Sequence, residues 1–445
     1  MDDDFTRGRN NPLTHLTPTY LNGLLGAVAG AFDISWLSQA PHNRIQILWA
    51  RQDALATNQL AILGDALKRM TPGNENWVTR RVNAVKGENG NNHKGDLFEL
   101  LALSMFVVDG QQVLPAKEAQ PGYDGTVTFR NGAQAIVSLK DFGSSAHQNG
   151  FELRATETET RLIAALTKER VTGLGLRLSA RHYVERLNEW TSLHNRLPNL
   201  VKDCVKGRLK GQVSDVWDYF AGKIATNGFQ IDPQRTSYSL TIYVPHHRNE
   251  QKNIESKIQG ACYNLAKHSA DLPEHQLPVL FIRLPESAAP SSCSRCAQEW
   301  LNSRPSAAVG VVVLYQPVVA MIDQKEGTFG IVHFIDLIAG DRFSRWQQST
   351  GWRQAIKAEV VVGTCTNMPT SLRLTDGSEL CSRYMYQRGQ IYTSFTSAPN
   401  GTLSGQMSNP APGIMVNLVL RIPGKSGEVI MYGKFPPDGK LLLYA

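Results

Sequence analysis

Two acids and a lysine occupy positions from which they could act together. Asp124 begins a short run that alternates like a strand, Lys140 ends the next such run, and Glu99 lies in a largely apolar segment before them. A carboxylate that faces a core is costly unless it is paired or bound to a metal. Carboxylate oxygens suit Mg²⁺, and an amine beside them can offset developing negative charge. These residue types therefore indicate metal-assisted chemistry.

A β-hairpin would bring the aspartate and the lysine to the same end of a sheet. Residues 123–129 and 134–139 are the two expected strands, and 130–132 reads Arg-Asn-Gly, a turn of the kind that closes hairpins. Because the strands are antiparallel, the start of the first faces the end of the second. Asp124 and Lys140 are thus expected at one end of the hairpin.

Helices are expected on both sides of this hairpin. Residues 96–106 form a largely apolar run that contains Glu99, with Asp96 suited to the first turn of a helix. A second helix is expected from residue 152 to about residue 170. The order over residues 93–168, roughly a sixth of the chain, is therefore helix, hairpin, helix.

This arrangement resembles the PD-(D/E)xK nuclease superfamily. In that family a helix glutamate, a strand aspartate and an acid-x-lysine pair on the next strand surround one or two divalent metals. Glu99 matches the helix acid, Asp124 matches the strand aspartate, and Ser138-Leu139-Lys140 matches the acid-x-lysine element. The resemblance implies an α/β (α+β) fold with a restriction-endonuclease-like mixed sheet flanked by helices.

The resemblance also implies an activity and a metal. Mg²⁺ or Mn²⁺ would be held by Glu99, Asp124 and the backbone carbonyl of Leu139, and the catalytic set would be Asp124, Lys140, Glu99 and Ser138. The metal would activate water, and Lys140 would orient the nucleophile or offset charge on phosphorus. We expect a metal-dependent DNA endonuclease, or a nuclease-derived effector of antiviral defence, that cleaves phosphodiester bonds.

Ser138 departs from the family pattern, which has Glu or Asp at this position. A hydroxyl is a poorer Mg²⁺ ligand than a carboxylate, so the missing charge would have to come from Glu152 or Glu157, or indirectly from His147 or Gln148. Without it, the chain would be a catalytically inactive nuclease-like protein that binds nucleic acid or acts as a scaffold. A third class is an interaction module of a larger assembly with no nucleic-acid role.

Positive charge is concentrated just after the hairpin. The formal net charge of the chain is +7, and residues 161–210 contain eleven Lys or Arg against four acids. Such an excess suits contact with a polyanion, although a solvated helical face is the alternative explanation. The candidate nucleic-acid contacts are Arg161, Lys168, Arg170, Arg177 and Arg181.

A chain of 445 residues is expected to form two or three domains. A helical N-terminal region is expected over 1–90, which ends in a polar, glycine-containing linker. A nuclease-like α/β core with a helical insertion and additional strands would occupy 91–350. The remaining 351–445 would form a separate β-rich module, through which the chain could form a homo-oligomer or bind a protein partner.

The assignment of several further elements to a sheet stays open. Helices are expected at 181–200 and 253–268, and strands at 173–178 and 237–244, which could return to the core sheet. Short β-rich runs at 309–315, 318–322 and 330–335 could extend that sheet or build a second one. The expected strands of the last ninety residues are 360–364, 371–374, 385–394, 414–422, 428–434 and 441–444.

Composition points to a cytoplasmic protein without a membrane span. No stretch of about twenty residues is apolar throughout, the first residues are acidic rather than basic, and six cysteines are too sparse for a disulfide framework. Cys293 and Cys296 have the spacing of half a zinc site, but no second pair follows. We therefore expect two thiols at the start of a helix.

Overall fold

A computed structural model of the protein describes residues 4–9, 15–40, 43–50, 54–87, 93–108, 110–117, 122–223, 238–285, 287–323, 328–353, 356–360, 362–366, 383–389, 392–397, 402–408 and 415–421. These residues form a mixed α/β fold with two mixed sheets and a third, antiparallel one, which confirms the predicted fold class. No helix in this part of the chain is long and apolar enough to cross a bilayer.

The larger sheet has seven strands in the order β1-β2-β3-β8-β9-β10-β11. Its strands are β1 (Gln112–Pro115), β2 (Gly125–Thr128), β3 (Gln134–Asp141), β8 (Gln276–Arg283), β9 (Val311–Asp323), β10 (Thr328–Ala339) and β11 (Thr364–Thr366). The first three form an antiparallel meander, whereas β3, β8 and β9 are mutually parallel. β10 pairs antiparallel with β9, so the β-rich runs after residue 309 extend this sheet.

The predicted hairpin is confirmed in β2 and β3. The two strands pair antiparallel, with Gly125 opposite Val137. The turn closes through a hydrogen bond of 2.9 Å from the Gly132 N–H to the Phe129 carbonyl. Gly132 has a φ of 82°, a conformation that costs little only without a side chain.

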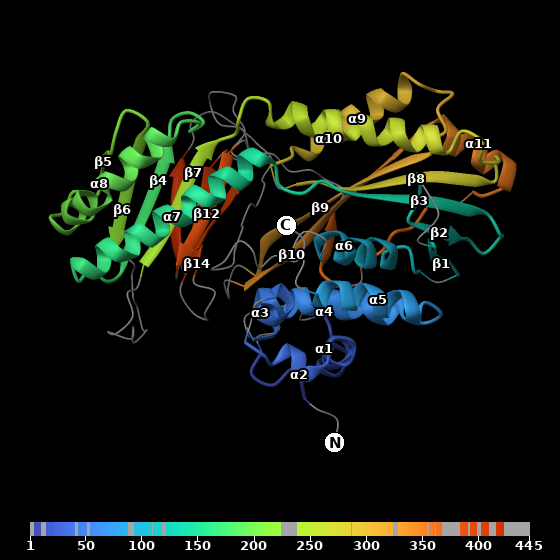
Figure 1. The fold of residues 1–445 in the computed structure, drawn as a ribbon, viewed down its shortest axis with the longest axis horizontal. Helices are drawn as coiled ribbons and strands as arrows, with labels where there is room; N and C mark the ends of the chain where they lie inside the picture. Colours follow the sequence, from blue (N-terminus) through green and yellow to red (C-terminus); the bar gives the residue numbers. More distant parts are fainter. Residues whose placement is uncertain are drawn as a thin grey trace.

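One face of the large sheet is covered by the N-terminal helices, as Figure 1 shows. These are α1 (Pro18–Phe32), α2 (Ile34–Leu37), α3 (Arg44–Ala50), α4 (Ala54–Met70), α5 (Glu75–Lys86) and α6 (His93–Ser104). Their apolar side chains form one core with β2, β3, β8 and β9. The described residues between 4 and 87 are thus largely helical, but they share their hydrophobic core with the sheet rather than forming a core of their own.

The opposite face packs against α9 (Glu250–His268) and α10 (Pro290–Asn302), and α11 (Asp341–Thr350) lies at the end of the sheet. The expected helix at 253–268 is therefore present. Cys293 and Cys296 are buried on the inner side of α10, where they contact Gln251 and Gln259 of α9. They are packing residues of this helix pair.

The second sheet has five strands in the order β12-β7-β4-β6-β5 and forms a separate core with α7 (Ala146–Lys168) and α8 (Leu187–Val205). Its strands are β4 (Leu174–Ala180), β5 (Lys210–Gln212), β6 (Trp217–Lys223), β7 (Tyr238–Pro245) and β12 (Arg383–Gly389). The expected strands at 173–178 and 237–244 therefore pair with each other in this sheet. The insertion expected to be helical is an α/β unit.

Two of the described C-terminal strands belong to sheets that are built earlier in the chain. β11 pairs with β10 of the large sheet, and β12 pairs with β7 of the second sheet, so both complete sheets built earlier in the chain. The expectation of a boundary at residue 350 is corrected, because both strands bond to sheet edges that would otherwise be open. The three strands β13 (Tyr392–Ser397), β14 (Thr402–Ser408) and β15 (Met415–Arg421) form the third sheet.

Some C-terminal predictions fall elsewhere. The run expected at 360–364 is a strand only at its end, where β11 begins. The run expected at 385–394 contains two strands, β12 and the start of β13, and the run at 414–422 contains β15. The strands expected at 371–374, 428–434 and 441–444 lie outside the described residues.

A buried carboxylate joins the two large sheets. Glu250, at the start of α9, is 1% exposed and accepts hydrogen bonds from Ser145 Oγ (2.9 Å), Tyr384 OH (2.8 Å) and Ser287 Oγ (2.7 Å). These hydroxyls come from the segment before α7, from β12 and from the segment before α10. Burial, with help from Glu250, raises the pKa of Tyr384, so the phenol stays a proton donor.

Replacing this carboxylate should loosen the junction. We expect Glu250→Ala to lower the free energy of unfolding by about 3 kcal/mol, because three buried hydroxyls lose their acceptor. Lys252→Ala, at an exposed position of the same helix, should change it by less than about 0.5 kcal/mol. Urea denaturation followed by circular dichroism measures both. Equal effects of the two substitutions would contradict this role.

Candidate functional site

Asp124 lies where β2 and β3 separate. β2 begins only at Gly125, whereas β3 continues to Asp141, so the end of β3 extends beyond its neighbour. The Asp124 carboxylate accepts a hydrogen bond of 2.6 Å from the Leu139 N–H, and its own N–H donates to the Val137 carbonyl at 2.7 Å. The Asp124 carboxylate thus takes the place of a β2 backbone carbonyl as the acceptor for Leu139, and it is held where the two strands separate.

Glu99 belongs to α6, the helix that packs on this part of the sheet. Its neighbour Phe98 contacts Phe281 of β8, with ring centroids 5.8 Å apart, which fixes the rotation of the helix. The Glu99 side chain is 23% exposed. Burial raises its pKa to about 7, and the negative charge of Asp124 acts in the same direction.

Arg81 of α5 is the basic partner of this site. Its two terminal nitrogens lie 2.5 Å from Asp96 Oδ1 and 2.5 Å from Glu99 Oε2. So short a pair favours an ionised Glu99, whereas burial and two further acids favour protonation. The pKa of Glu99 is raised overall, because burial of the carboxyl is the largest of these contributions.

Sequence reasoning missed Arg81. Asp96 and Glu99 are three residues apart on one helix, a spacing that places both on the same face and could have suggested a shared basic partner. Which of the many arginines supplies it depends on how α5 packs against α6. That packing is not readable from spacing.

Ser138 and Lys140 point to the other face of the sheet. In the parallel register they lie beside Leu280 and Ile282, which belong to the core beneath α9 and α10. Leu139 points the opposite way, into the core shared with α6. Ser138 is buried, at 3% exposed, and Lys140 is exposed. Lys140 therefore emerges on the face of β3 away from α6, the helix that carries Glu99, while Asp124 lies at the edge of β3 that β2 leaves open.

The acid that follows Lys140 does share the face of Glu99. Asp141 accepts two hydrogen bonds from Arg283 of β8, at 2.7 and 2.6 Å, and the Arg283 guanidinium lies 5.4 Å from the ring centroid of Phe98. Arg283 is only 3% exposed. This bidentate pair ties β3 to β8 directly beneath α6 and neutralises Asp141.

The alternative sources of charge suggested for Ser138 are engaged on α7, the helix of the second sheet. Glu152 accepts a hydrogen bond of 3.1 Å from Gln148 Nε2. Glu157 pairs with Arg154 and Arg161, at 3.1 and 3.0 Å. His147 Nδ1 lies 3.1 Å from the Tyr183 hydroxyl. These contacts are local to the second unit, so the suggestion that these residues complete the site of Asp124 is corrected.

The donor set narrows the choice of metal. Within the described ranges, no group of three or more His, Cys, Asp or Glu is spaced to hold a metal ion. The available donors are the two carboxylates of Glu99 and Asp124. Mg²⁺ is commonly bound by one or two carboxylates, with water and substrate phosphate filling the other positions, whereas structural zinc uses four nitrogen or sulfur ligands. The residues present therefore fit Mg²⁺ or Mn²⁺ better than zinc.

The five basic residues expected to contact nucleic acid do not form one surface. Arg161 pairs with Glu157, and Arg181 makes two hydrogen bonds to Asp218, at 3.0 and 2.8 Å. Arg177 lies over the ring of Tyr243, 5.9 Å from its centroid, on the sheet face away from α7. Lys168 and Arg170 are exposed at the other end of β4 from Arg181.

Comparison of the chain with protein-family models, with curated proteins and with solved structures finds no match.

The raised pKa of Glu99 predicts a pH-dependent stability. Below about pH 4.5 the carboxyl is protonated in both states and contributes nothing. As pH rises from about 4.5 to 7 the unfolded chain loses the proton first, so the folded state should become less stable by about 3 kcal/mol.

We expect Glu99→Gln to remove this pH dependence, because the amide carries no charge at any of these pH values. Urea unfolding between pH 4.5 and 8 measures it, with Glu185→Gln at an exposed position as the control. Parallel profiles for Glu99→Gln and the unmodified protein would refute the assignment.

Proposed function

We propose that the protein is a metal-dependent DNA endonuclease, or an effector derived from one, that cleaves phosphodiester bonds. The observation that carries the proposal is the Asp124 carboxylate, which the Leu139 N–H holds where β2 and β3 separate and whose charge helps to raise the pKa of the buried Glu99 carboxyl on α6. Two acids, Asp96 and Glu99, share the Arg81 guanidinium, and the charge of Asp124 acts on Glu99 as well, so a divalent cation would compensate negative charge there.

The order and placement of the elements support the same proposal. α6 is followed by the meander β1-β2-β3, and β8 then pairs parallel with β3 after α9 has crossed the opposite face. This is a mixed sheet flanked by helices, as the resemblance to the PD-(D/E)xK superfamily implies. The second α/β unit is inserted between β3 and α9.

Glu99 and Asp124 would hold Mg²⁺, together with the Leu139 carbonyl. The ion would supply Lewis acidity at a phosphate oxygen and lower the pKa of bound water. Asp124 is fixed by the Leu139 N–H, which keeps its charge at the sheet edge. Lys140 would reach the same edge from the other face on its flexible four-carbon stem and offset charge on the phosphate. Ser138 is buried and brings no charge to the site.

The Arg81 pairing favours a second candidate, a nuclease-like protein that binds nucleic acid or acts as a scaffold without cleaving. Glu99 already has a cationic partner at 2.5 Å, and a serine replaces the third family acid. In that case the guanidinium would neutralise the site permanently. Metal binding and cleavage distinguish the two functions.

By analogy with the family, the endonuclease would act in the cytoplasm against invading DNA. DNA is the proposed partner in both candidate functions. The biological role rests on the analogy alone.

Cleavage of supercoiled plasmid with Mg²⁺ or Mn²⁺ tests the endonuclease. We expect Asp124→Asn to reduce the rate at least about 100-fold, because the amide oxygen can still accept from Leu139 but no longer carries charge. Lys140→Ala should also reduce it, and Lys252→Ala, an exposed lysine of α9, should leave it unchanged. Cleavage that survives both Asp124→Asn and Glu99→Gln would exclude this site.

The binding candidate predicts a different result. The unmodified protein would retain duplex DNA without cutting it, and Mg²⁺ would not raise its unfolding midpoint. A metal-dependent increase in that midpoint, abolished by Asp124→Asn, would count against the binding candidate.

A further inference from the structure

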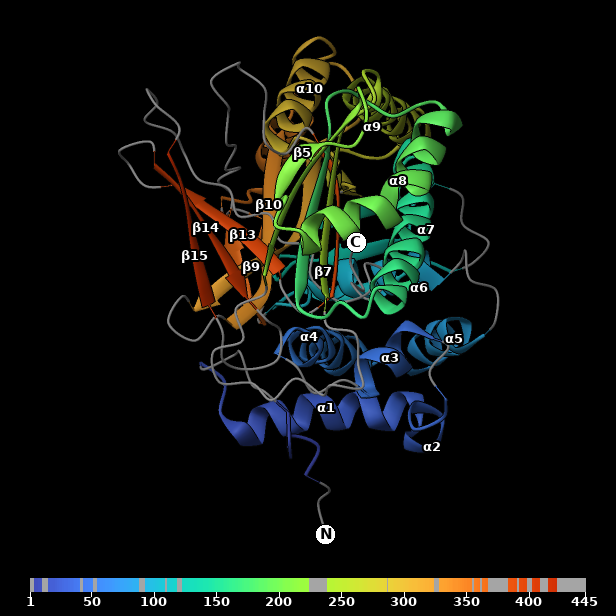
Figure 2. The same cartoon turned by 90° about the vertical axis from the view of Figure 1, so that its left-hand side faces the viewer.

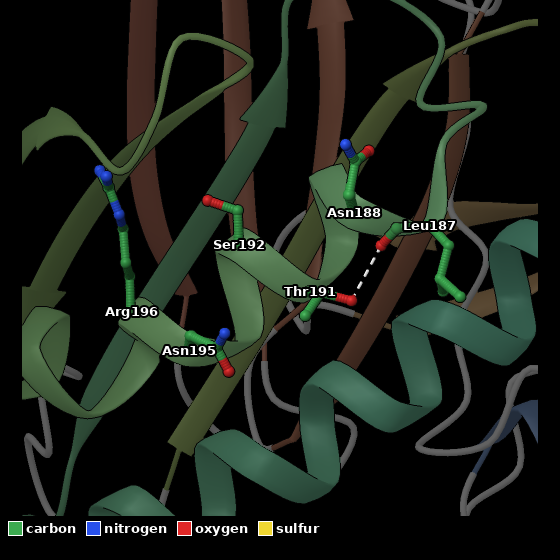
Figure 3. Close-up of a pocket in the computed structure, with 6 residues that line it drawn as sticks. All are labelled: Leu187, Asn188, Thr191, Ser192, Asn195 and Arg196. Carbon is green, nitrogen blue, oxygen red and sulfur yellow. Dashed lines mark hydrogen bonds between the residues drawn. The ribbon is translucent and has the colours of Figure 1, made fainter.

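The outer face of α8 is an exposed surface of an unusual composition. α8 buries Trp190, Leu193, Leu197 and Val201 against the five-stranded sheet. It lies on the outside of the second unit, away from α6 (Figures 1 and 2). Its outward side carries a surface hollow of about 660 Å³, drawn in Figure 3, lined by Leu187, Asn188, Thr191, Ser192, Asn195 and Arg196.

Amide and hydroxyl side chains form a stripe along this face. Asn188, Ser192, Asn195 and Asn199 follow one another at helical spacing and lie within one side of α8. Asn and Ser are poor helix formers that favour caps and turns, yet only Asn188 lies in the first turn of α8, whereas Ser192, Asn195 and Asn199 lie further inside the helix, and none of the four belongs to the core of the unit. Packing and helix propensity therefore do not explain this choice of residues.

Thr191 differs from the others. Its hydroxyl donates back to the Leu187 carbonyl at 3.0 Å, which Figure 3 shows as a dashed line. Such a bond satisfies the side chain within its own helix. Asn188 and Asn195, in contrast, are exposed and extend away from the helix axis (Figure 3). Each amide carries both donors and acceptors toward the surroundings.

Positive charge continues the same stripe. Lys202 and Lys206 lie one and two turns beyond Asn199 on that side, and both are exposed. Lys202 lies 3.7 Å from Glu169 at the end of α7, an exposed pair that a phosphate contact would replace. The stretch 186–210 contains six Lys or Arg against two acids, of which Asp203 pairs with Arg208 at 3.5 Å. A stripe of hydrogen-bonding side chains that ends in lysines suits a polyanion whose bases present hydrogen-bond donors and acceptors, such as a nucleic acid.

We propose that the outer face of α8 enters the major groove of double-stranded DNA. Asn188 and Asn195 would contact base edges, since an Asn amide can bond adenine N6 and N7 together, and Lys202 and Lys206 would contact phosphates. An α-helix about 10–12 Å across fits a groove about 12 Å wide, whereas the deep, narrow major groove of duplex RNA excludes it.

This inference rests on the proposed function for the identity of the polymer. It assigns recognition to the second unit and leaves the Glu99–Asp124 site to the chemistry. In this proposal the face of α8, rather than the five basic residues named in the sequence analysis, makes the main contact with nucleic acid.

Fluorescence anisotropy with the full chain and 30-base-pair duplexes tests the proposal. A preferred sequence is first selected from a randomised duplex pool. Asn188→Ala with Asn195→Ala should lower affinity for that sequence at least tenfold and leave affinity for random duplex within about twofold, because base contacts carry the specificity. Asn253→Ala with Asn264→Ala, at exposed positions of α9, is the matched control and should change neither affinity.

Lysine substitution gives an independent measurement. Lys202→Gln with Lys206→Gln should make the dependence of log K on log salt shallower by about 1.8, since each phosphate contact contributes about 0.9. Alanine is a better helix former than asparagine, so loss of binding in the first variant cannot come from a weaker helix, and circular dichroism checks this.

Several results would overturn the inference. These are equal losses in the α8 and α9 variants, an unchanged salt slope, equally tight binding of duplex RNA, or no binding of duplex DNA. The outcome is separable from that of the endonuclease test. Asp124→Asn should reduce cleavage at least about 100-fold and retain binding. A protein that binds through α8 but does not cleave would refute only the endonuclease.

Discussion

The hydrogen bond from the Leu139 N–H to the Asp124 carboxylate fixes the geometry on which the candidate site depends. Where β2 departs from β3, the backbone of β3 would otherwise lose its partner, and an unpaired buried N–H is costly. A side chain supplies the acceptor and leaves the strands free to diverge. The same carboxylate then adds its charge to a place where Glu99 and Asp96 already compete for Arg81. Asp124 thus both accepts the hydrogen bond of the Leu139 backbone N–H and adds negative charge to the site.

Local sequence patterns predicted the elements around this site well. The Asn-Gly turn and the alternation on either side of it specify the hairpin, and the apolar run around Glu99 specifies a helix. These signals depend on neighbours within a few residues. Alternation along β3 places Leu139 and Lys140 on opposite faces of the sheet. Which of these faces α6 covers depends on tertiary packing, and Leu139 lies in the core shared with α6, so Lys140 points away from it.

Long-range pairing also explains the errors in domain organisation. Glycine- and proline-containing turns near residue 350 and beyond indicate β structure, but they carry no information about which sheet a strand will join. β11 and β12 are close in sequence and belong to different sheets. The N-terminal helices likewise share a core with the large sheet because their apolar faces have no other cover. The composition changes that mark segments in the sequence therefore do not coincide with the limits of the hydrophobic cores.

The late arrival of β12 has a consequence for synthesis of the chain on the ribosome. β7 can pair with β4 as soon as the second unit has been synthesised. Its other edge stays unpaired until β12, about 140 residues further along the chain, has been synthesised. An exposed strand edge is a template for pairing with another chain, and slowly completed sheets are vulnerable to aggregation. Truncation before Arg383 would leave that edge permanently open, so nascent or shortened chains should associate with one another far more readily than the full-length protein.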